Sequence, residues 1–378
     1  MLAAVAIEGT TMSAMCQPDE DHSHYAASDG DGGSGAMVKP VGGALQNDKA
    51  KDKQLMTPLF VAATFGNFTI CKALIDAGAS FFCKDESEQM ALHRASMEGH
   101  LDIVELLLSS ATKLGGAGMV EKLVGDQDDE GQTCLHHAVN NGHYEVAKRL
   151  IQAGADVNTV RDSLTTPLHA AAAIGHTELI ELLLQNHARL DCIDSYQQTP
   201  LHKAAIYNQP AAITTLLAAG AKIERRDKDS FTPLLLAASG GHADALQTLL
   251  DNDADIEAVD KDDKTAVFWC AEQGNCEALE VLLNDPRCAD LVDESDRYDN
   301  SPLHEAARRG YYKIIDKLLA AGSRVDNKNE DEETALHVAA EAGQVKCNVK
   351  AEHSKYNETN SHKSISDSTD HTFAAGLN

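Results

Sequence analysis

The stretch Thr166-Pro167-Leu168-His169 decides the fold of this chain, because close copies of it recur along most of the sequence. The nine copies of this phrase begin at Thr57, Met90, Thr133, Thr166, Thr199, Thr232, Thr265, Ser301 and Thr334. Successive starts lie 33 residues apart in six of the eight intervals, and the other two intervals are 43 and 36 residues. A fixed period of this length indicates a stack of similar supersecondary units, which are numbered here by their phrase.

Each unit carries the signals of two short helices. The Thr supplies a side-chain oxygen that caps the first helix, and the Pro that often follows fixes φ where a missing N–H costs nothing. Nine residues after the Thr comes Gly, or Asn208 in unit five, which ends the first helix in a left-handed conformation. A second helix then carries an apolar pair such as Leu182-Leu183. One unit cannot bury this apolar face alone, so we expect stability to come from stacked neighbours.

An acidic residue stands five positions before the phrase in seven of the nine units. A short carboxylate suits a turn at this place, because it accepts hydrogen bonds from nearby backbone N–H groups. The acids are Asp52, Asp85, Asp128, Asp194, Asp227, Asp260 and Asp296, and Arg161 and Asn329 replace them in units four and nine. We therefore expect a hairpin loop ahead of each first helix.

The phrase, its period and its turn signals resemble those of ankyrin repeats. The resemblance implies an all-α solenoid of about nine helix-turn-helix units joined by hairpin loops, with the last unit incomplete. We expect this solenoid at residues 52–344. A polar, Gly-rich head at 1–51 and a polar tail at 345–378 are expected to be disordered. The resemblance also implies a non-catalytic scaffold or adaptor that binds protein partners through its concave face and hairpin tips.

The composition narrows the class of partner and the compartment. The formal net charge is −27, and the acids crowd into the loops between units. They form either a solvated rim that keeps the solenoid soluble or a surface for a basic partner, and they disfavour nucleic acid as a ligand. No secretory signal and no apolar stretch near the length of a membrane helix is expected. The nine scattered cysteines indicate small buried thiols in a reducing compartment, the cytosol.

Histidines and candidate catalytic residues are explained by their place in the unit. Ten of the 17 histidines are either the fourth letter of the phrase or the residue after the terminating Gly. Their imidazoles are expected to bond loop backbone, so we predict no metal site. Nucleotide-binding Gly motifs are missing from the sequence, and the Ser, His and acidic residues fall at repeat positions. The sequence therefore predicts neither an enzyme nor a cofactor.

Positions that vary between units are the candidates for partner binding. In this architecture they are the hairpin tips and the exposed ends of the first helices. Tyr and Arg are favoured as anchors at protein interfaces, and aromatic residues make up only 4% of this chain. The predicted partner-binding residues are Tyr196, Tyr207, Lys228, Phe231, Gln273, Arg297, Tyr298, Arg308 and Arg309. Ordinary loop variation is the alternative explanation for the same pattern.

Units seven and eight carry a narrower resemblance. A three-residue expansion separates Leu282-Leu283 from the segment Leu291-Val-Asp-Glu-Ser-Asp296. This arrangement resembles the cytosolic ankyrin domain of TRPA (transient receptor potential ankyrin) cation channels. The ninth unit has its phrase but no Leu-Leu helix after Gly343, so we expect a truncated form. The alternative function is therefore a fragment or short isoform of a TRPA-type subunit, at the cytosolic face of the plasma membrane and associated with full-length subunits.

Overall fold

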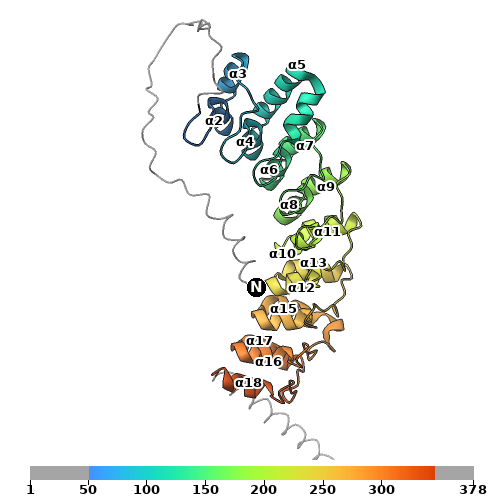
Figure 1. Cartoon of the computed structure of the whole chain (residues 1–378). Helices are drawn as coiled ribbons and strands as arrows, with labels where there is room; N and C mark the ends of the chain where they lie inside the picture. The colour runs from blue at the N-terminus through green and yellow to red at the C-terminus, as the bar shows by residue number, and fades with distance from the viewer. Residues whose placement is uncertain (1–50, 345–378) are drawn as a thin grey trace, which may run out of the picture. The chain divides into compact units, whose positions relative to one another are not determined.

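The computed structural model describes residues 51–344, and these residues form an all-α stack of paired helices (Figure 1). Within them one isolated β-bridge joins Lys328 to Thr334, and no strand occurs. The predicted all-α solenoid is confirmed. The predicted disordered head and tail lie outside the described residues, apart from Lys51.

Every phrase opens the first helix of its unit. The first helices are α2 (Pro58–Thr64), α4 (Ala91–Met97), α6 (Cys134–Asn140), α8 (Pro167–Ile174), α10 (Pro200–Ile206), α12 (Pro233–Gly240), α14 (Ala266–Gln273), α16 (Pro302–Arg309) and α18 (Ala335–Glu341). The second helices are α3 (Phe68–Asp76), α5 (Leu101–Gly125), α7 (Tyr144–Gln152), α9 (Thr177–Gln185), α11 (Pro210–Ala218), α13 (Ala243–Asp251), α15 (Cys276–Asn284) and α17 (Tyr312–Ala320).

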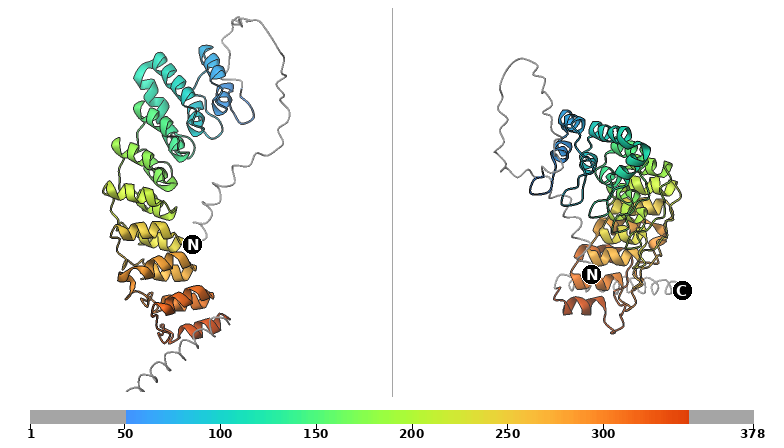
Figure 2. Two further views of the ribbon diagram at one scale, coloured as in Figure 1. Left: turned by 180° about the vertical axis from the view of Figure 1, so that it is seen from behind. Right: turned by 45° about the horizontal axis from the view of Figure 1, so that its top comes forward.

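The helices stack in two layers. First helices pack on first helices of neighbouring units, and second helices pack on second helices. Where the stack bends, α4, α6 and α8 line the inside of the bend and α7, α9 and α11 lie outside it (Figure 1). The same stacking is seen from behind and from above (Figure 2). Small Ala residues such as Ala171 and Ala172 are fully buried between first helices, which lets the units approach closely.

The helix signals predicted from the sequence are confirmed at both ends of the first helix. The Thr232 hydroxyl accepts a hydrogen bond from the backbone N–H of Leu235 at 3.4 Å, which is a helix cap. Gly175 ends α8 with φ +74°, and Asn208 follows α10 with φ +52°. Both residues adopt the left-handed conformation that Gly and Asn tolerate best.

Both irregular intervals lie at the ends of second helices. The 43-residue interval extends α5, and Gly116 breaks this helix with a non-helical φ of +65°. The 36-residue interval holds a short 3-10 helix, η3 (Pro286–Cys288), directly after α15. Neither insertion changes the hairpin loops or the first helices of its unit.

The expectation that no apolar stretch has membrane-spanning length was wrong for α5. Among residues 51–344, this one helix is long and apolar enough to cross a membrane by length and composition. Its apolar residues, however, include Ile103, Leu107 and Leu123, which are fully buried. They pack in the core of the stack, and the apolar character of α5 is therefore that of a core helix interrupted at Gly116.

Candidate functional site

In several units the histidine of the phrase joins its unit to the next. In unit four the backbone N–H of Thr166 donates to Nδ1 of His169 at 3.2 Å, while Nε2 lies 3.0 Å from the carbonyl oxygen of Gln198 in the following hairpin. The same forward contact joins His202 to Phe231 and His304 to Glu333. His93 instead lies 3.2 Å from the carbonyl oxygen of Asp126, which follows the lengthened α5. The prediction that these imidazoles bond loop backbone is confirmed.

Burial keeps several of these imidazoles neutral. It lowers the pKa of His93, His136 and His169 to about 4, because the charged ring would lose its hydration. A neutral ring with Nδ1 accepting donates through Nε2, which matches the forward contact. These histidines therefore hold the stack together as hydrogen-bonding groups.

One oxygen of the turn carboxylate accepts hydrogen bonds from the backbone of its own hairpin. In unit three, Oδ1 of Asp128 accepts the backbone N–H groups of Glu130 at 3.1 Å and Gln132 at 2.7 Å. The equivalent acids in the other units make the same pair of bonds, as Asp194 does with Tyr196 and Gln198. The predicted role of the acid in the turn is confirmed.

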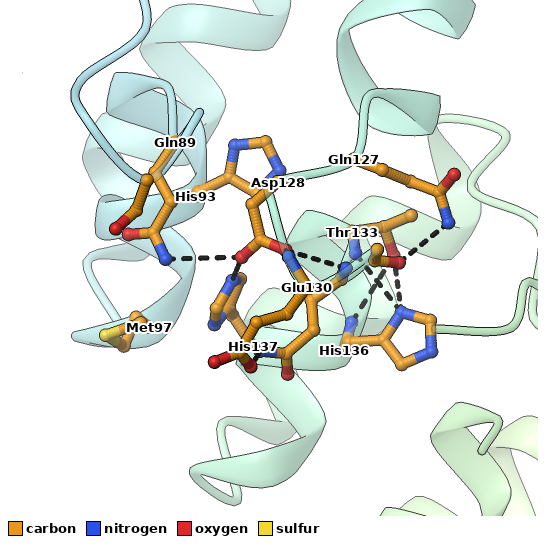
Figure 3. A network of polar contacts seen from close by, with 12 residues as sticks. Gln89, His93, Met97, Gln127, Asp128, Glu130, Thr133, His136 and His137 are labelled. Carbon is orange, nitrogen blue, oxygen red and sulfur yellow. Dashed lines mark hydrogen bonds and ion pairs between the residues drawn. The ribbon is translucent and has the colours of Figure 1, made fainter. Parts of the chain in front are cut away.

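The second carboxylate oxygen reaches the first helix and the preceding unit (Figure 3). Nε2 of His137 lies 2.8 Å from Oδ2 of Asp128, and the Gln89 amide donates to the same oxygen at 3.2 Å. The rings of His93 and His137 meet edge to face at 5.7 Å. Burial would raise the pKa of Asp128, but the hydrogen bonds from His137 and from the Gln132 N–H hold it below the usual value.

The donor to this second oxygen varies from unit to unit. In units two, three, five and seven a donor comes from the residue nine positions after the acid, in the first helix. Lys203 pairs with Asp194 at 2.8 Å, and the Trp269 indole N–H donates to Asp260 at 3.1 Å. Although burial opposes ionisation of both acids, the ammonium of Lys203 lowers the pKa of Asp194, whereas burial raises that of Asp260. The same scaffold thus presents a different donor to the turn acid in each of these four units.

The hairpin tips are fixed in a row by backbone hydrogen bonds. The N–H of Lys228 donates to the carbonyl of Tyr196 at 3.1 Å, and the N–H of Glu330 donates to that of Tyr298 at 3.1 Å. Equivalent bonds join the other neighbouring hairpins. Side chains at the tips are therefore carried on a backbone that is already ordered, which lowers the entropy lost when they bind a partner.

The predicted partner-binding residues of units five and six form one group. Tyr196 is 46% exposed, and the ammonium of Lys228 lies 4.0 Å from the centre of its ring. Phe231 is half-buried, with its ring centre 5.1 Å from that of Trp269. Tyr207 is 40% exposed at the end of α10. This set, which also includes Trp269 and Lys203, is called the aromatic group below.

The predicted residues of units seven and eight form a second, charged group. Arg309 contacts Glu272 at 2.9 Å, and Arg308 contacts Glu305 at 2.6 Å. Arg297 pairs with Asp262 at 3.0 Å on a hairpin that also carries Tyr298, which is 54% exposed. Gln273 is half-buried at the end of α14. The set of Glu272, Glu305, Arg308, Arg309 and Lys264 is called the arginine group.

Five residues of these groups, Trp269, Lys203, Lys264, Glu272 and Glu305, are outside the predicted partner-binding set. Trp269, Lys203 and Lys264 join the predicted residues, since Lys264 lies 4.8 Å from the Trp269 ring centre and 2.6 Å from Glu272. The prediction considered hairpin tips and helix ends, but Trp269 and Lys203 lie in the middle of first helices. A usable signal was present, because Trp269 is the only tryptophan of the chain and lies at a position that varies between units.

Cysteine and metal chemistry have little support in the described part of the chain. Among the cysteines between residues 51 and 344, Cys71, Cys134, Cys270 and Cys288 are buried free thiols. Burial raises the pKa of Cys71 to about 11, which disfavours the reactive thiolate. Within the same residues, no three His, Cys, Asp or Glu side chains gather in a way that could hold a metal ion.

Family models for ankyrin repeats match most of the chain. The model for three copies covers residues 23–117, 223–293 and 303–362, and the model for many copies covers 135–184 and 175–217. The chain belongs to the ankyrin-repeat family. Ankyrin domains generally mediate protein–protein interaction, which is the established class of function for this fold.

Relatives of this ankyrin chain differ widely in what their names describe. It is 35% identical over 108 residues to "Probable 26S proteasome regulatory subunit p28" of Saccharomyces cerevisiae, covering 28% of the chain and 43% of that protein. It is 31% identical over 116 residues to "Transient receptor potential cation channel subfamily A member 1 homolog" of Caenorhabditis elegans, covering 31% of the chain and 9% of that protein. The matched region thus spans less than half of either curated relative.

A solved ankyrin domain supports the same fold. The crystal structure of the human ASB11 ankyrin repeat domain superposes with a TM-score of 0.52 at 26% identity. The match covers 58% of this chain and 98% of the ASB11 domain.

Proposed function

We propose that this ankyrin chain is a non-catalytic scaffold that binds a protein partner through the inner face and hairpin tips of units five to eight. The observation that carries the proposal is the clustering of exposed aromatic and cationic side chains there. Tyr196, Tyr207 and Tyr298 are each at least 40% exposed. Such residues anchor protein interfaces, because they bury a large area at low entropic cost.

The surroundings of these side chains support an interface. Lys228 lies over the ring of Tyr196, and Phe231 rests on Trp269, so the aromatic group is held in place before any partner arrives. The ordered row of hairpins carries the same residues. Because Cys71, Cys134, Cys270 and Cys288 are buried free thiols, which a reducing compartment preserves, we propose the cytoplasm as its location.

Site-specific photo-crosslinking tests this function. A benzophenone amino acid replaces Tyr207 on the inner face or, as the control, Gln247, which is exposed on the second helix α13. We expect the benzophenone at position 207 to form a discrete adduct with a protein partner. Excess unlabelled chain should compete for the partner and abolish the adduct. The variant Tyr196→Ser/Tyr207→Ser should compete less well. Equal adducts at both positions, or adducts at Gln247 alone, contradict the proposal.

A second candidate is membership of a TRPA-type channel subunit. It is favoured by the nematode channel relative and by the 36-residue interval, which η3 occupies at the place that resembles TRPA. On this reading the repeats associate with full-length channel subunits and do not conduct ions. Co-precipitation with a full-length TRPA subunit at matched expression supports it, and failure to associate counts against it.

A further inference from the structure

The arginine group is a cationic patch on an acidic chain. It contains three cations, Lys264, Arg308 and Arg309, and two carboxylates, Glu272 and Glu305. The Glu side chains are only about 10% exposed, whereas those of the arginines are about 40% exposed. The two carboxylates therefore lie beneath the arginine side chains, and the guanidinium groups face the solvent.

The buried carboxylates orient both guanidinium groups. Arg308 donates to Glu305 at 2.6 Å and to Asn300 at 3.4 Å, and Arg309 lies between Glu272 at 2.9 Å and Glu305 at 3.6 Å. These two hydrogen bonds use two of the five N–H donors of Arg308. The remaining donors are held on a rigid fork, which is the arrangement that recognises a carboxylate in two-point contact.

The neighbourhood of the patch limits its ligand. Asp262 and Asp299 lie on adjacent hairpins, and the next hairpin carries the acidic run 330–333. A long polyanion would be repelled by these acids and by the net charge of −27. Nucleic acid needs many Lys and Arg contacts along its backbone, and three cations do not supply them. A ligand must carry its negative charge in a short central stretch.

We propose that Arg308 and Arg309 are the receptor for a short protein segment that carries two adjacent carboxylates between basic or neutral residues. This inference rests on the proposed scaffold function and specifies its partner. The carboxylates of the segment bind the two guanidinium groups, and its basic flanks lie against the acidic hairpins. Tyr298 lies on the same hairpin as Asn300, which Arg308 contacts, and it is 54% exposed.

Two synthetic peptides test the proposal, because they separate recognition from general attraction. The first is acetyl-Gly-Lys-Ser-Glu-Glu-Ser-Lys-Gly-amide, and in the second Gln-Gln replaces Glu-Glu. General attraction to an acidic chain favours the Gln-Gln peptide, since it is more positive. Recognition by the arginine group favours the Glu-Glu peptide, by roughly tenfold in Kd for each charged contact that the Gln-Gln peptide loses.

The readout is the Nε–H resonances of the arginines in 15N-labelled full-length chain. We expect the Glu-Glu peptide to shift those of Arg308 and Arg309 and to leave those of Arg189 and Arg324 in place. Tighter binding of the Gln-Gln peptide, or equal shifts at all arginines, overturns the proposal. Absence of any shift also overturns it.

Variants confirm the residues involved. Arg308→Gln/Arg309→Gln is expected to abolish the preference for the Glu-Glu peptide, while Lys313→Gln/Arg324→Gln, with the same change in charge, keeps it. Arg308→Lys/Arg309→Lys retains the ion pairs that support folding but lacks the planar fork, so the preference should fall by about fivefold. If the peptides show no preference while the Tyr207 adduct forms, this inference fails and the scaffold function stands. If the adduct is also missing, both fail.

Discussion

The turns of units three and four share one backbone and differ in the side chain that begins them. The backbone N–H of Asp128 donates to Gln132 at 2.9 Å, and that of Arg161 donates to Thr165 at 3.1 Å. Both turns then pass through a left-handed residue, Gly131 in unit three and Leu164 in unit four. Unit three adds a carboxylate with four partners, which unit four lacks. The comparison teaches that stacking forces the turn to form and that its side chains only stabilise it.

The largest expected change in the free energy of unfolding follows from removal of the Asp128 carboxylate. Asp128→Ala leaves two backbone N–H groups, His137 and Gln89 without their shared acceptor. Because these donors are buried, we expect the free energy of unfolding to fall by roughly 3 kcal/mol. Urea unfolding followed by circular dichroism measures it. The control is Asp129→Ala on the same hairpin, where the side chain is exposed and the change should be small. A loss no larger than that of the control would show that the four contacts contribute little.

The next effect is a dependence on pH that arises from the phrase histidines. His93, His136 and His169 have a folded pKa of about 4 against an ordinary value of 6.5. The unfolded chain therefore binds more protons between these two values, and stability that is complete above pH 6.5 is lost as the pH falls toward 4. Each histidine contributes a slope of up to about 1.4 kcal/mol per pH unit.

The variant His136→Leu isolates one histidine, since Leu235 holds the same position in unit six. Unfolding free energies measured between pH 5 and pH 6.5 should fall less steeply for this variant than for the natural chain. Identical slopes would mean that His136 is protonated in the folded state as readily as in the unfolded chain.

In unit four we expect a smaller change in stability, and in the opposite direction. Arg161→Asp supplies the missing acceptor for the N–H groups of Ser163 and Thr165, so it should stabilise the chain by about 1 kcal/mol. Arg161→Ala removes the arginine without adding the carboxylate and is the matched control. If both variants have the same stability, the carboxylate has no effect in this turn.

The smallest expected effect concerns the left-handed position. Leu164 has φ +60°, which costs a branched residue on the order of 1 kcal/mol relative to Gly. Leu164→Gly should therefore raise the thermal midpoint slightly, whereas Leu164→Ala keeps the unfavourable φ and should not. A lower midpoint for the Gly variant would show that the half-exposed Leu side chain makes a contact of greater value.

The sequence predicted those features that repeat and depend on neighbouring residues. Turn acids such as Asp194, helix caps such as Thr232 and the terminating Gly175 were all identified, because each acts within a few residues of itself. Contacts between units were harder to predict. Nothing local in the sequence tells that Gln89 donates to Asp128, 39 residues away, or that Arg309 contacts Glu272, 37 residues away. These contacts depend on how the stacked helices face one another.

The forward contact of the phrase histidine also limits where this chain can change in length. A residue added between a phrase and the next hairpin would move Gln198 away from His169, or would separate the equivalent pair in another unit. The contact is missing where an insertion follows the second helix, since His93 reaches only Asp126 at the end of α5 and Phe268 replaces the histidine in unit seven. Both insertions in the chain lie at the ends of second helices, one lengthening α5 and the other forming η3. The three units whose histidine reaches the residue before the next phrase all keep the 33-residue interval, so this contact and the regular register occur together.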